Sequence, residues 1–287
     1  MKGLLSESYL KDVTPQMELS AFCLLWGACF AFDEYSTITR VLEVERVDNL
    51  SQNVFPPNNA RNGVTDRRKE ADALKYHGTT TVAMTCTDGV VLCTDMRVTA
   101  GYLYIAHRQG KKVHKLDSHV GVTIAGTVAE AQNMIDTLKY YANIYKLENQ
   151  KPILVRSLAR ISANILFANR FYPLIADFLI GGWDRIDGYV IYSVDFFGAI
   201  TKEDAVSTGS GSPVALGIIE DQYKKGMSVK QVVPIAIQAV TAAIKRNAGT
   251  GDGFDVAVIT EESGYRELSR EEKAQQLMAI TGSRSLG

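Results

Sequence analysis

Cysteine, histidine and an excess of charge of either sign are scarce in this chain of 287 residues, and each scarcity excludes a class of protein. Its four cysteines have neither the density of a disulfide-rich secreted domain nor the C-x-x-C spacing of a metal site. Cys86 and Cys93 flank a predicted turn, which is compatible with a disulfide or with two free thiols, and we expect the reduced state of a cytoplasmic protein. A net charge of −1 gives no sign of nucleic-acid or membrane binding.

Long apolar segments and metal-binding spacings are also missing. The apolar run from Leu19 to Phe32 is too short to span a bilayer and lacks the basic start of a signal peptide, so we expect a helix that packs against protein. His107, His114 and His119 match no helical zinc pair, and Gly209–Ser212 lacks the lysine that follows in a phosphate-binding loop. We therefore expect neither a cofactor nor a metal ion.

The composition divides the chain into an N-terminal appendage and one folded body. Hydrophobic residues make up 46% of the chain and charged residues 22%, enough apolar material for a large core. Before residue 79, a β-rich piece from Ser36 to Val47 is followed by a polar, proline-containing stretch at 51–72, which is typical of a linker. We expect the body to start at residue 79 and to run to 287.

Hydrophobic periodicity divides the body into two groups of strands, each followed by two helices. Asp88-Gly89 predicts a hairpin between strands at Thr79–Thr87 and Val90–Asp95, and Ser228 and Ser269 are expected helix N-caps. Two sheets face to face, with helices outside, bury this pattern most economically. Further strands are expected at Tyr102–Ala106, Lys112–Leu116, Val120–Ala125, Ala176–Gly181, Tyr189–Val194 and Phe254–Thr260, and helices at Ala129–Leu147, Ile153–Tyr172, Pro213–Tyr223, Ser228–Arg246 and Ser269–Ile280.

The segment Gly78-Thr79-Thr80-Thr81 contains a potential nucleophile at the head of a strand. A threonine hydroxyl needs a neighbouring base, and an N-terminal threonine supplies its own α-amine, whose pKa is about 7.7–8.0. Inside an intact chain the same nitrogen is an amide and cannot serve. Cleavage between Gly78 and Thr79 would therefore create the site and make residues 1–78 a pro-segment. Taken alone, three threonines are more simply explained as β-branched strand residues.

Six segments resemble, in order and approximate spacing, those of a proteasome β subunit of the N-terminal threonine hydrolase family. The likeness runs from about His77 to the last helix and covers the body, not the leader. The body is most similar to archaeal-type subunits, whereas a leader of this length is more like that of the eukaryotic chymotrypsin-like subunit. The resemblance implies an α+β fold, the four-layer αββα sandwich of N-terminal-nucleophile hydrolases. The segments are Gly78–Val82, Asp95–Thr99, Gly110–Val113, Ile124–Gly126, Ile180–Asp184 and Ser207–Pro213.

The resemblance assigns Thr79 as the nucleophile, with Lys112 near it and Asp95 as the acidic partner of that lysine. An ammonium close to the α-amine disfavours the protonated amine and stabilises an oxyanion. Lys111 and Lys112 point to opposite faces of a strand, so only one of them can face the site. The resemblance favours Lys112, because the lysine of the family precedes the apolar residue that is Val113 here. The segment before them is one residue longer than in most relatives, which leaves Lys111 as the alternative. Arg97 is expected nearby as a second positive group.

By the same resemblance, Ser210 lies beside the threonine amine and the Gly126 N–H, at a helix entrance, donates to the oxyanion. Asn247 and Thr250 stand where the family pattern has an aspartate and a serine. Thr250 keeps a hydroxyl, but an amide carries no charge and cannot accept a proton, so Asn247 favours the alternative of a structural β subunit without a competent site. The residues expected to contact substrate are Thr99, Val98, Ile124 and Val128, with Gln132 deeper in an apolar pocket.

The activity implied is that of a threonine endopeptidase of the 20S proteasome core, which cleaves unfolded polypeptides after hydrophobic residues once its pro-segment has been removed autocatalytically. Its partners would be other β subunits and α-ring subunits, in seven-membered rings stacked as a four-ring barrel. A regulatory ATPase would act through the α ring, and neither nucleic acid nor a membrane is expected. A different amidohydrolase of the same superfold is a further alternative.

Overall fold

The computed structural model describes residues 78–100 and 104–284. They belong to one compact unit, Val64–Gly287. The apolar run at 19–32, the β-rich piece at 36–47 and the linker at 51–72 lie outside the described residues. The expected division between a pro-segment and a body at residue 79 is therefore a prediction that these residues do not test.

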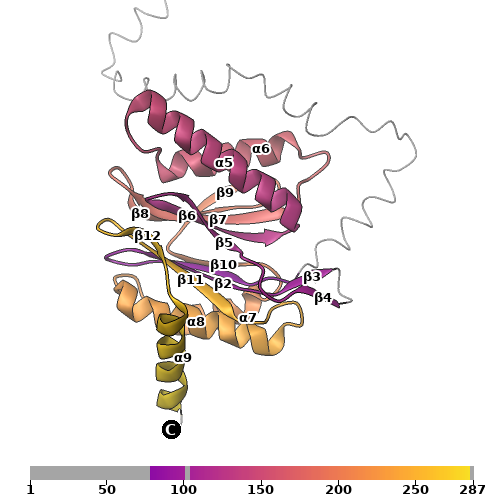
Figure 1. Cartoon of the computed structure of the whole chain (residues 1–287), viewed down its shortest axis with the longest axis vertical. Coiled ribbons are helices and arrows are strands. Elements are labelled where there is room, and N and C mark those ends of the chain that lie inside the picture. Colours follow the sequence, from indigo (N-terminus) through magenta and orange to yellow (C-terminus); the bar gives the residue numbers. More distant parts are fainter. Residues whose placement is uncertain (1–77, 101–103, 285–287) are drawn as a thin grey trace, which may run out of the picture. The chain divides into compact units, whose positions relative to one another are not determined.

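Two antiparallel five-stranded sheets form the middle of the body (Figure 1). Helices α5 and α6 cover the outer face of one sheet, and α7 and α8 cover the outer face of the other (Figure 1). This is the predicted α+β sandwich of two sheets between helices. The sheet beside α7 and α8 has the order β10 (Ala205–Thr208), β1 (Thr81–Thr85), β2 (Val90–Asp95), β11 (Phe254–Thr260), β12 (Gly264–Glu267). The other has the order β5 (Val113–Asp117), β6 (Val120–Gly126), β7 (Ala176–Asp184), β8 (Gly188–Val194), β9 (Ile200–Glu203).

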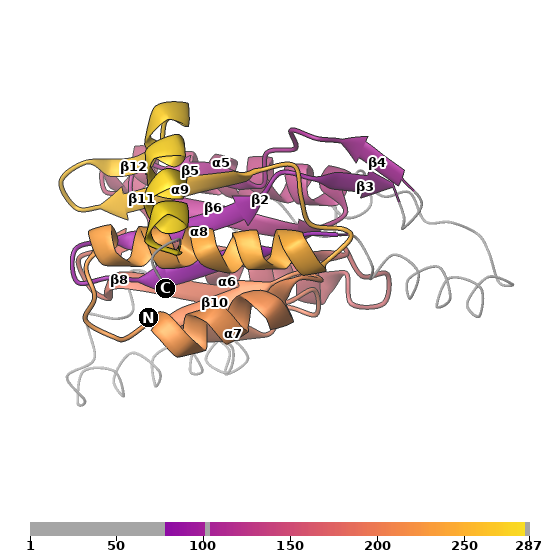
Figure 2. The ribbon, with the colours of Figure 1, turned by 90° about the horizontal axis from the view of Figure 1, so that it is seen from below.

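The helices follow the strand groups as the periodicity predicts. They are α5 (Val128–Asn149), α6 (Val155–Ala168), α7 (Ser212–Gln222), α8 (Val229–Arg246) and α9 (Arg270–Arg284). A small hairpin of β3 (Val98–Ala100) and β4 (Tyr104–His107) extends from one end of the sheets, and α9 crosses α8 beside β12 (Figure 2). None of these helices in the described part of the chain is long and apolar enough to cross a membrane.

Alternating side chains of β2 explain how the layers hold together. Val91 and Cys93 pack under α8, whereas Val90 and Leu92 pack against the second sheet. Because both faces are covered, every residue of β2 is buried, and the strand is an unbroken apolar run until Thr94 and Asp95 at its end. The strand therefore delivers a buried carboxylate to the rim of the sandwich, where the candidate site lies.

The ends of the helices agree with the prediction at two N-caps and differ from it at the end of α6. Helix α6 ends at Ala168 rather than Tyr172, because the side-chain amide of Asn169 donates to the Ile165 carbonyl and closes the last turn. The expected N-caps Ser228 and Ser269 are confirmed by reciprocal bonds with Gln231 and Glu272. The prediction missed the short strands β3, β9, β10 and β12.

Cys86 and Cys93 are free thiols, as expected for the reduced state. Burial raises the pKa of Cys86 to about 12 and that of Cys93 further, so neither forms a thiolate near neutral pH. We therefore assign both cysteines to the core rather than to chemistry.

Candidate active site

Thr79 lies two residues before the start of β1 and is almost completely buried, with 3% of its surface exposed. Its hydroxyl donates to the Gly78 carbonyl oxygen at 2.8 Å, and its backbone N–H donates to Ser210 Oγ at 3.4 Å. Its own carbonyl accepts the N–H of Gly211 at 3.2 Å. The loop between β10 and α7 therefore closes over the candidate nucleophile.

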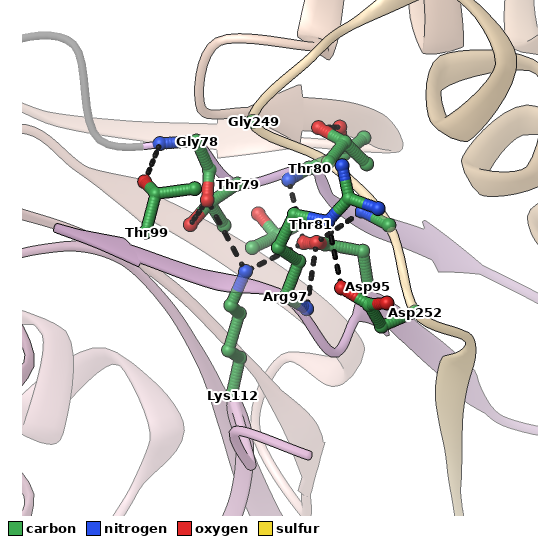
Figure 3. A network of polar contacts seen from close by, with 12 residues as sticks. Gly78, Thr79, Thr80, Thr81, Asp95, Arg97, Thr99, Lys112, Gly249 and Asp252 are labelled. Atoms are coloured by element: carbon green, nitrogen blue, oxygen red, sulfur yellow. Dashed lines mark hydrogen bonds and ion pairs between the residues drawn. The ribbon is translucent and has the colours of Figure 1, made fainter. Parts of the chain in front are cut away.

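A buried ion pair lies on the other side of the Gly78–Thr79 junction (Figure 3). Lys112 Nζ is 2.8 Å from Asp95 Oδ1 and donates to the Gly78 carbonyl oxygen at 3.4 Å. Lys112 is 5% exposed and Asp95 is fully buried. Burial lowers the pKa of Lys112, and the adjacent Asp95 carboxylate opposes that shift. Lys111 points outward to Glu267, at 2.7 Å, so Lys112 is the lysine that faces Thr79.

Asp95 connects three segments around the site. Its Oδ1 accepts the Thr80 N–H at 2.9 Å in addition to Lys112 Nζ. Its Oδ2 accepts the N–H of Arg97 at 3.1 Å and that of Gly251 at 3.0 Å (Figure 3). A carboxylate with four donors is fully satisfied, so it fixes the start of β1, the end of β2 and the approach to β11 relative to one another.

Arg97, the expected second positive group, lies close to Asp95. Arg97 contacts Asp95 through its backbone N–H, while its side chain turns to Asp252, with Nε 2.7 Å from Oδ2. Its Nη1 also donates to the Ala248 carbonyl at 2.8 Å. Arg97 therefore holds the loop between α8 and β11, because that loop contains the acceptors that match its planar donor group.

Asn247 caps α8 and accepts hydrogen bonds from both sides of the site. Its Oδ1 receives Ser210 Oγ at 3.1 Å, the Gly249 N–H at 3.0 Å and Thr250 Oγ1 at 3.1 Å. Thr250 Oγ1 is in turn 2.8 Å from Thr80 Oγ1. A chain of hydroxyl and amide groups thus links Ser210, beside the Thr79 nitrogen, to the start of β1.

The backbone before Thr79 fits only glycine. A Cβ built on Gly78 would lie 2.0 Å from the Cα of Gly249, and one built on Gly249 would lie 2.2 Å from the Cα of Gly78. The Gly78 N–H donates to Thr99 Oγ1, on β3, at 3.3 Å. Residue 78 is therefore held between β3 and the loop after α8, with its carbonyl directed at Thr79 and Lys112.

Gly126 ends β6 with a φ of +125°, a conformation that side chains disfavour, and a Cβ there would lie 2.1 Å from the Ile175 carbonyl oxygen. The neighbouring segment is held from α5: Glu130 Oε2 accepts the Ile175 N–H at 2.8 Å, and Thr127 N–H donates to the Ile175 oxygen at 2.8 Å. The position of Gly126 therefore depends on contacts from the first turn of α5.

The residues expected to contact substrate have different environments. Thr99 contacts Gly78, Val98 is half-buried on β3, and Val128 is 40% exposed on the first turn of α5. Ile124 is buried in the core under α5, and Gln132 is exposed. Hydrogen bonds thus connect six of the expected site residues: Thr79, Asp95, Lys112, Ser210, Asn247 and Thr250. In the described part of the chain, four others make no hydrogen bond to Thr79: Gly126, Val98, Ile124 and Val128.

Several residues of the site have no distinctive sequence signal. Thr80 contacts both Asp95 and Thr250. Gly249 and Glu130 were not singled out, although Gly-x-Gly-Asp-Gly at 249–253 marks a loop of unusual backbone. Within residues 78–100 and 104–284, no group of three His, Cys, Asp or Glu side chains is arranged to hold a metal ion.

Comparisons with known proteins identify the family of this chain. A family model described as "Proteasome subunit" matches residues 75–259. The chain is 47% identical over 197 residues to "Proteasome subunit beta 2" of Nitrosopumilus maritimus, an alignment that covers 69% of this chain and 92% of that protein. It is 46% identical over 195 residues to "Proteasome subunit beta" of Methanothermobacter thermautotrophicus, covering 68% and 92%. A third relative, "Proteasome subunit beta 2" of Pyrobaculum islandicum, is 47% identical over 203 residues, covering 71% and 99%.

Proposed function

Because this chain belongs to the proteasome subunit family, as a β subunit of archaeal type, we propose that Thr79 becomes the N-terminal nucleophile of a threonine endopeptidase. The observation that carries the proposal is the Gly78 carbonyl oxygen, which accepts hydrogen bonds from Thr79 Oγ1 at 2.8 Å and Lys112 Nζ at 3.4 Å. A carbonyl polarised by a cation and adjacent to a hydroxyl is poised for acyl transfer to that hydroxyl.

Leader removal would be the first reaction of the site. Thr79 Oγ bonds to the Gly78 carbonyl carbon, the Gly78–Thr79 C–N bond breaks, and the hydroxyl proton passes to the released nitrogen. Water then hydrolyses the resulting ester, which frees residues 1–78 as a carboxylic acid and restores the hydroxyl. The new α-amine stays beside Ser210, since the amide N–H from which it derives is already 3.4 Å from Ser210 Oγ.

Peptide cleavage would repeat this chemistry on a bound substrate. The free amine takes the Thr79 hydroxyl proton, the oxygen attacks the substrate carbonyl, and the departing amine is protonated before water clears the ester. Lys112 stabilises the negative oxygen and Gly126 N–H donates to it. Thr99 binds the substrate backbone in the place that Gly78 occupies, and the apolar Val98, Ile124 and Val128 favour unfolded polypeptides with a hydrophobic residue before the cleaved bond.

As a proteasome subunit the chain assembles with other proteasome subunits. We propose that it forms a seven-membered β ring, that an α ring caps it in a four-ring barrel, and that a regulatory ATPase acts through the α ring in the cytoplasm. The chemistry uses no cofactor, because the nucleophile, the base and the oxyanion donors all belong to the chain.

A structural β subunit is the second candidate, and a single feature favours it: Asn247 provides no carboxylate near the site. Against it, Asn247 Oδ1 accepts the hydrogen bonds of Ser210 and Thr250, which keeps both hydroxyl groups aligned without charge. The two candidates differ in whether Thr79 ever becomes N-terminal.

The deciding experiment is co-expression of the full chain with an α partner, followed by intact mass and N-terminal sequencing. An enzyme yields a subunit that starts at Thr79, and the Thr79→Ala variant keeps the complete chain and cleaves no peptide. Thr79→Ser is the matched control, because it keeps a hydroxyl and should still be processed. A wild-type chain that assembles with its leader attached, or a Thr79→Ala chain cut at the same bond, would disprove the proposal.

A further inference from the structure

The side chain at position 247 organises the surroundings of the candidate nucleophile without carrying charge. We propose that Asn247 positions Ser210 beside the Thr79 amine as a neutral acceptor, so that the mature site works at lower pH than the same site with an aspartate. This inference rests on the proposed function, because it concerns the amine that leader removal would free.

The role of Asn247 in positioning Ser210 follows from the direction of the hydrogen bonds that the two side chains make. Ser210 Oγ donates to Asn247 Oδ1 at 3.1 Å, which leaves the oxygen lone pairs of Ser210 to accept the Thr79 N–H at 3.4 Å. The same Oδ1 also binds the Gly249 N–H and Thr250 Oγ1, so it cannot rotate away without breaking three bonds. A carboxamide oxygen performs this task as well as a carboxylate oxygen, since all three partners are donors.

The charge part follows from the ionised groups around the Thr79 nitrogen. Asp95, at the end of β2, pairs with Lys112, at the head of β5, and Arg97 pairs with Asp252, ahead of β11. The described loop over Thr79, residues 209–211, carries no charge. The two ion pairs balance without a contribution from residue 247.

A carboxylate at position 247 would add one uncompensated negative charge to this balance. The side-chain oxygen is two hydrogen bonds from the Thr79 nitrogen, or about 6 Å, and Coulomb attraction over that distance at an effective dielectric of about 20–80 favours an ammonium by about 0.5–2 pH units. The amine must be neutral to accept the hydroxyl proton. An aspartate would therefore raise the amine pKa and move the acid limb of activity to higher pH, whereas asparagine keeps it low.

The test uses particles assembled from the full chain and its α partner, with Asn247→Asp and Asn247→Ala variants. The first readout is kcat/KM between pH 5 and 9 for a fluorogenic peptide with a hydrophobic residue before the cleaved bond. This is about the pH range in which an α-amine titrates. The second readout is an NMR titration of the 13C-labelled Thr79 methyl group. Ala248→Asp is the matched control, because it adds the same charge to the neighbouring exposed residue, where water screens it.

We expect Asn247→Asp to raise both the acid limb and the methyl titration midpoint by about 0.5–2 pH units, and Ala248→Asp to shift them by less than about 0.3. We expect Asn247→Ala to lower kcat about tenfold with little change in KM or in the acid limb, because it removes the acceptor and no charge. Processed, active particles whose limb and midpoint do not move in Asn247→Asp would overturn this inference and leave the proposed function standing. A wild-type subunit that retains its leader overturns both, and leader removal restored only by Asn247→Asp would show that asparagine disables the site.

Discussion

Replacing Asp95 by asparagine is the most informative perturbation of the fold around Thr79. The change keeps the shape of the side chain but leaves the Lys112 ammonium without its counter-ion in a buried position. It also replaces one acceptor oxygen by an NH2 group, which faces either Lys112 and Thr80 or Arg97 and Gly251, so two of the four donors lose their partner.

The expected cost follows from burial. Removing one partner of a buried ion pair costs about 3–5 kcal/mol, because the remaining charge stays desolvated. For a body of this size each kcal/mol lowers the Tm by about 2–4 °C, so Asp95→Asn should lower the Tm by about 6–20 °C. The loss of the carboxylate also removes the interaction that opposes the downward shift of the Lys112 pKa, so that pKa should fall further.

The assay is thermal unfolding of the full chain in a Thr79→Ala background, which keeps every variant in one processing state. Glu267→Gln is the matched control: Glu267 Oε1 is 2.7 Å from a lysine, Lys111, but the two side chains are 38% and 50% exposed. An exposed pair is worth about 0–1 kcal/mol, so this variant should lose less than about 4 °C. Equal Tm losses for the two variants would refute the argument that burial makes the Asp95–Lys112 pair decisive.

Three further predictions concern leader removal, oxyanion geometry and pH. Gly249→Ala should slow leader removal at least about tenfold, because its Cβ would lie 2.2 Å from the Cα of Gly78. Gly217→Ala is the control and should not slow it, because a Cβ there meets open space. An unchanged rate of leader removal in Gly249→Ala, followed by intact mass, would contradict the prediction. Glu130→Ala should lower kcat about tenfold in processed particles with KM unchanged, because the Ile175 N–H, beside Gly126, loses its acceptor. Glu130→Gln keeps an acceptor oxygen and should recover most of the rate. A change in KM alone would count against this prediction. Asp177→Asn should raise the Tm above pH 6 and leave it unchanged below pH 4. Burial raises the pKa of Asp177 in the folded state to about 6, so its carboxyl destabilises the fold once it ionises. A gain in Tm that does not depend on pH would show that ionisation of Asp177 is not the cause.

The fold was predictable where neighbours in the sequence decide the structure. Helices α5 to α9 follow apolar residues at helical spacing, and the Ser228 and Ser269 caps depend on residues three positions away. The strands β9, β10 and β12 were not predicted, because four-residue strands with exposed or half-buried residues leave little periodic signal. Helix α6 was predicted too long, because Phe171 and Tyr172 continue the apolar pattern beyond Asn169, which caps the helix and donates its side-chain amide to the Ile165 carbonyl.

The sequence by itself determined the family and the layered αββα architecture, because periodicity and short motifs are local properties of the chain. Only the tertiary structure decided which lysine faces Thr79, that the Arg97 side chain binds Asp252 rather than Asp95, and that Gly249 leaves no room for a side chain at residue 78. These contacts join residues that are 34, 155 and 171 positions apart (112 and 78, 252 and 97, 249 and 78). They form only when two sheets stack and bring the ends of β1, β2 and α8 to one rim, so no pattern among sequence neighbours encodes them.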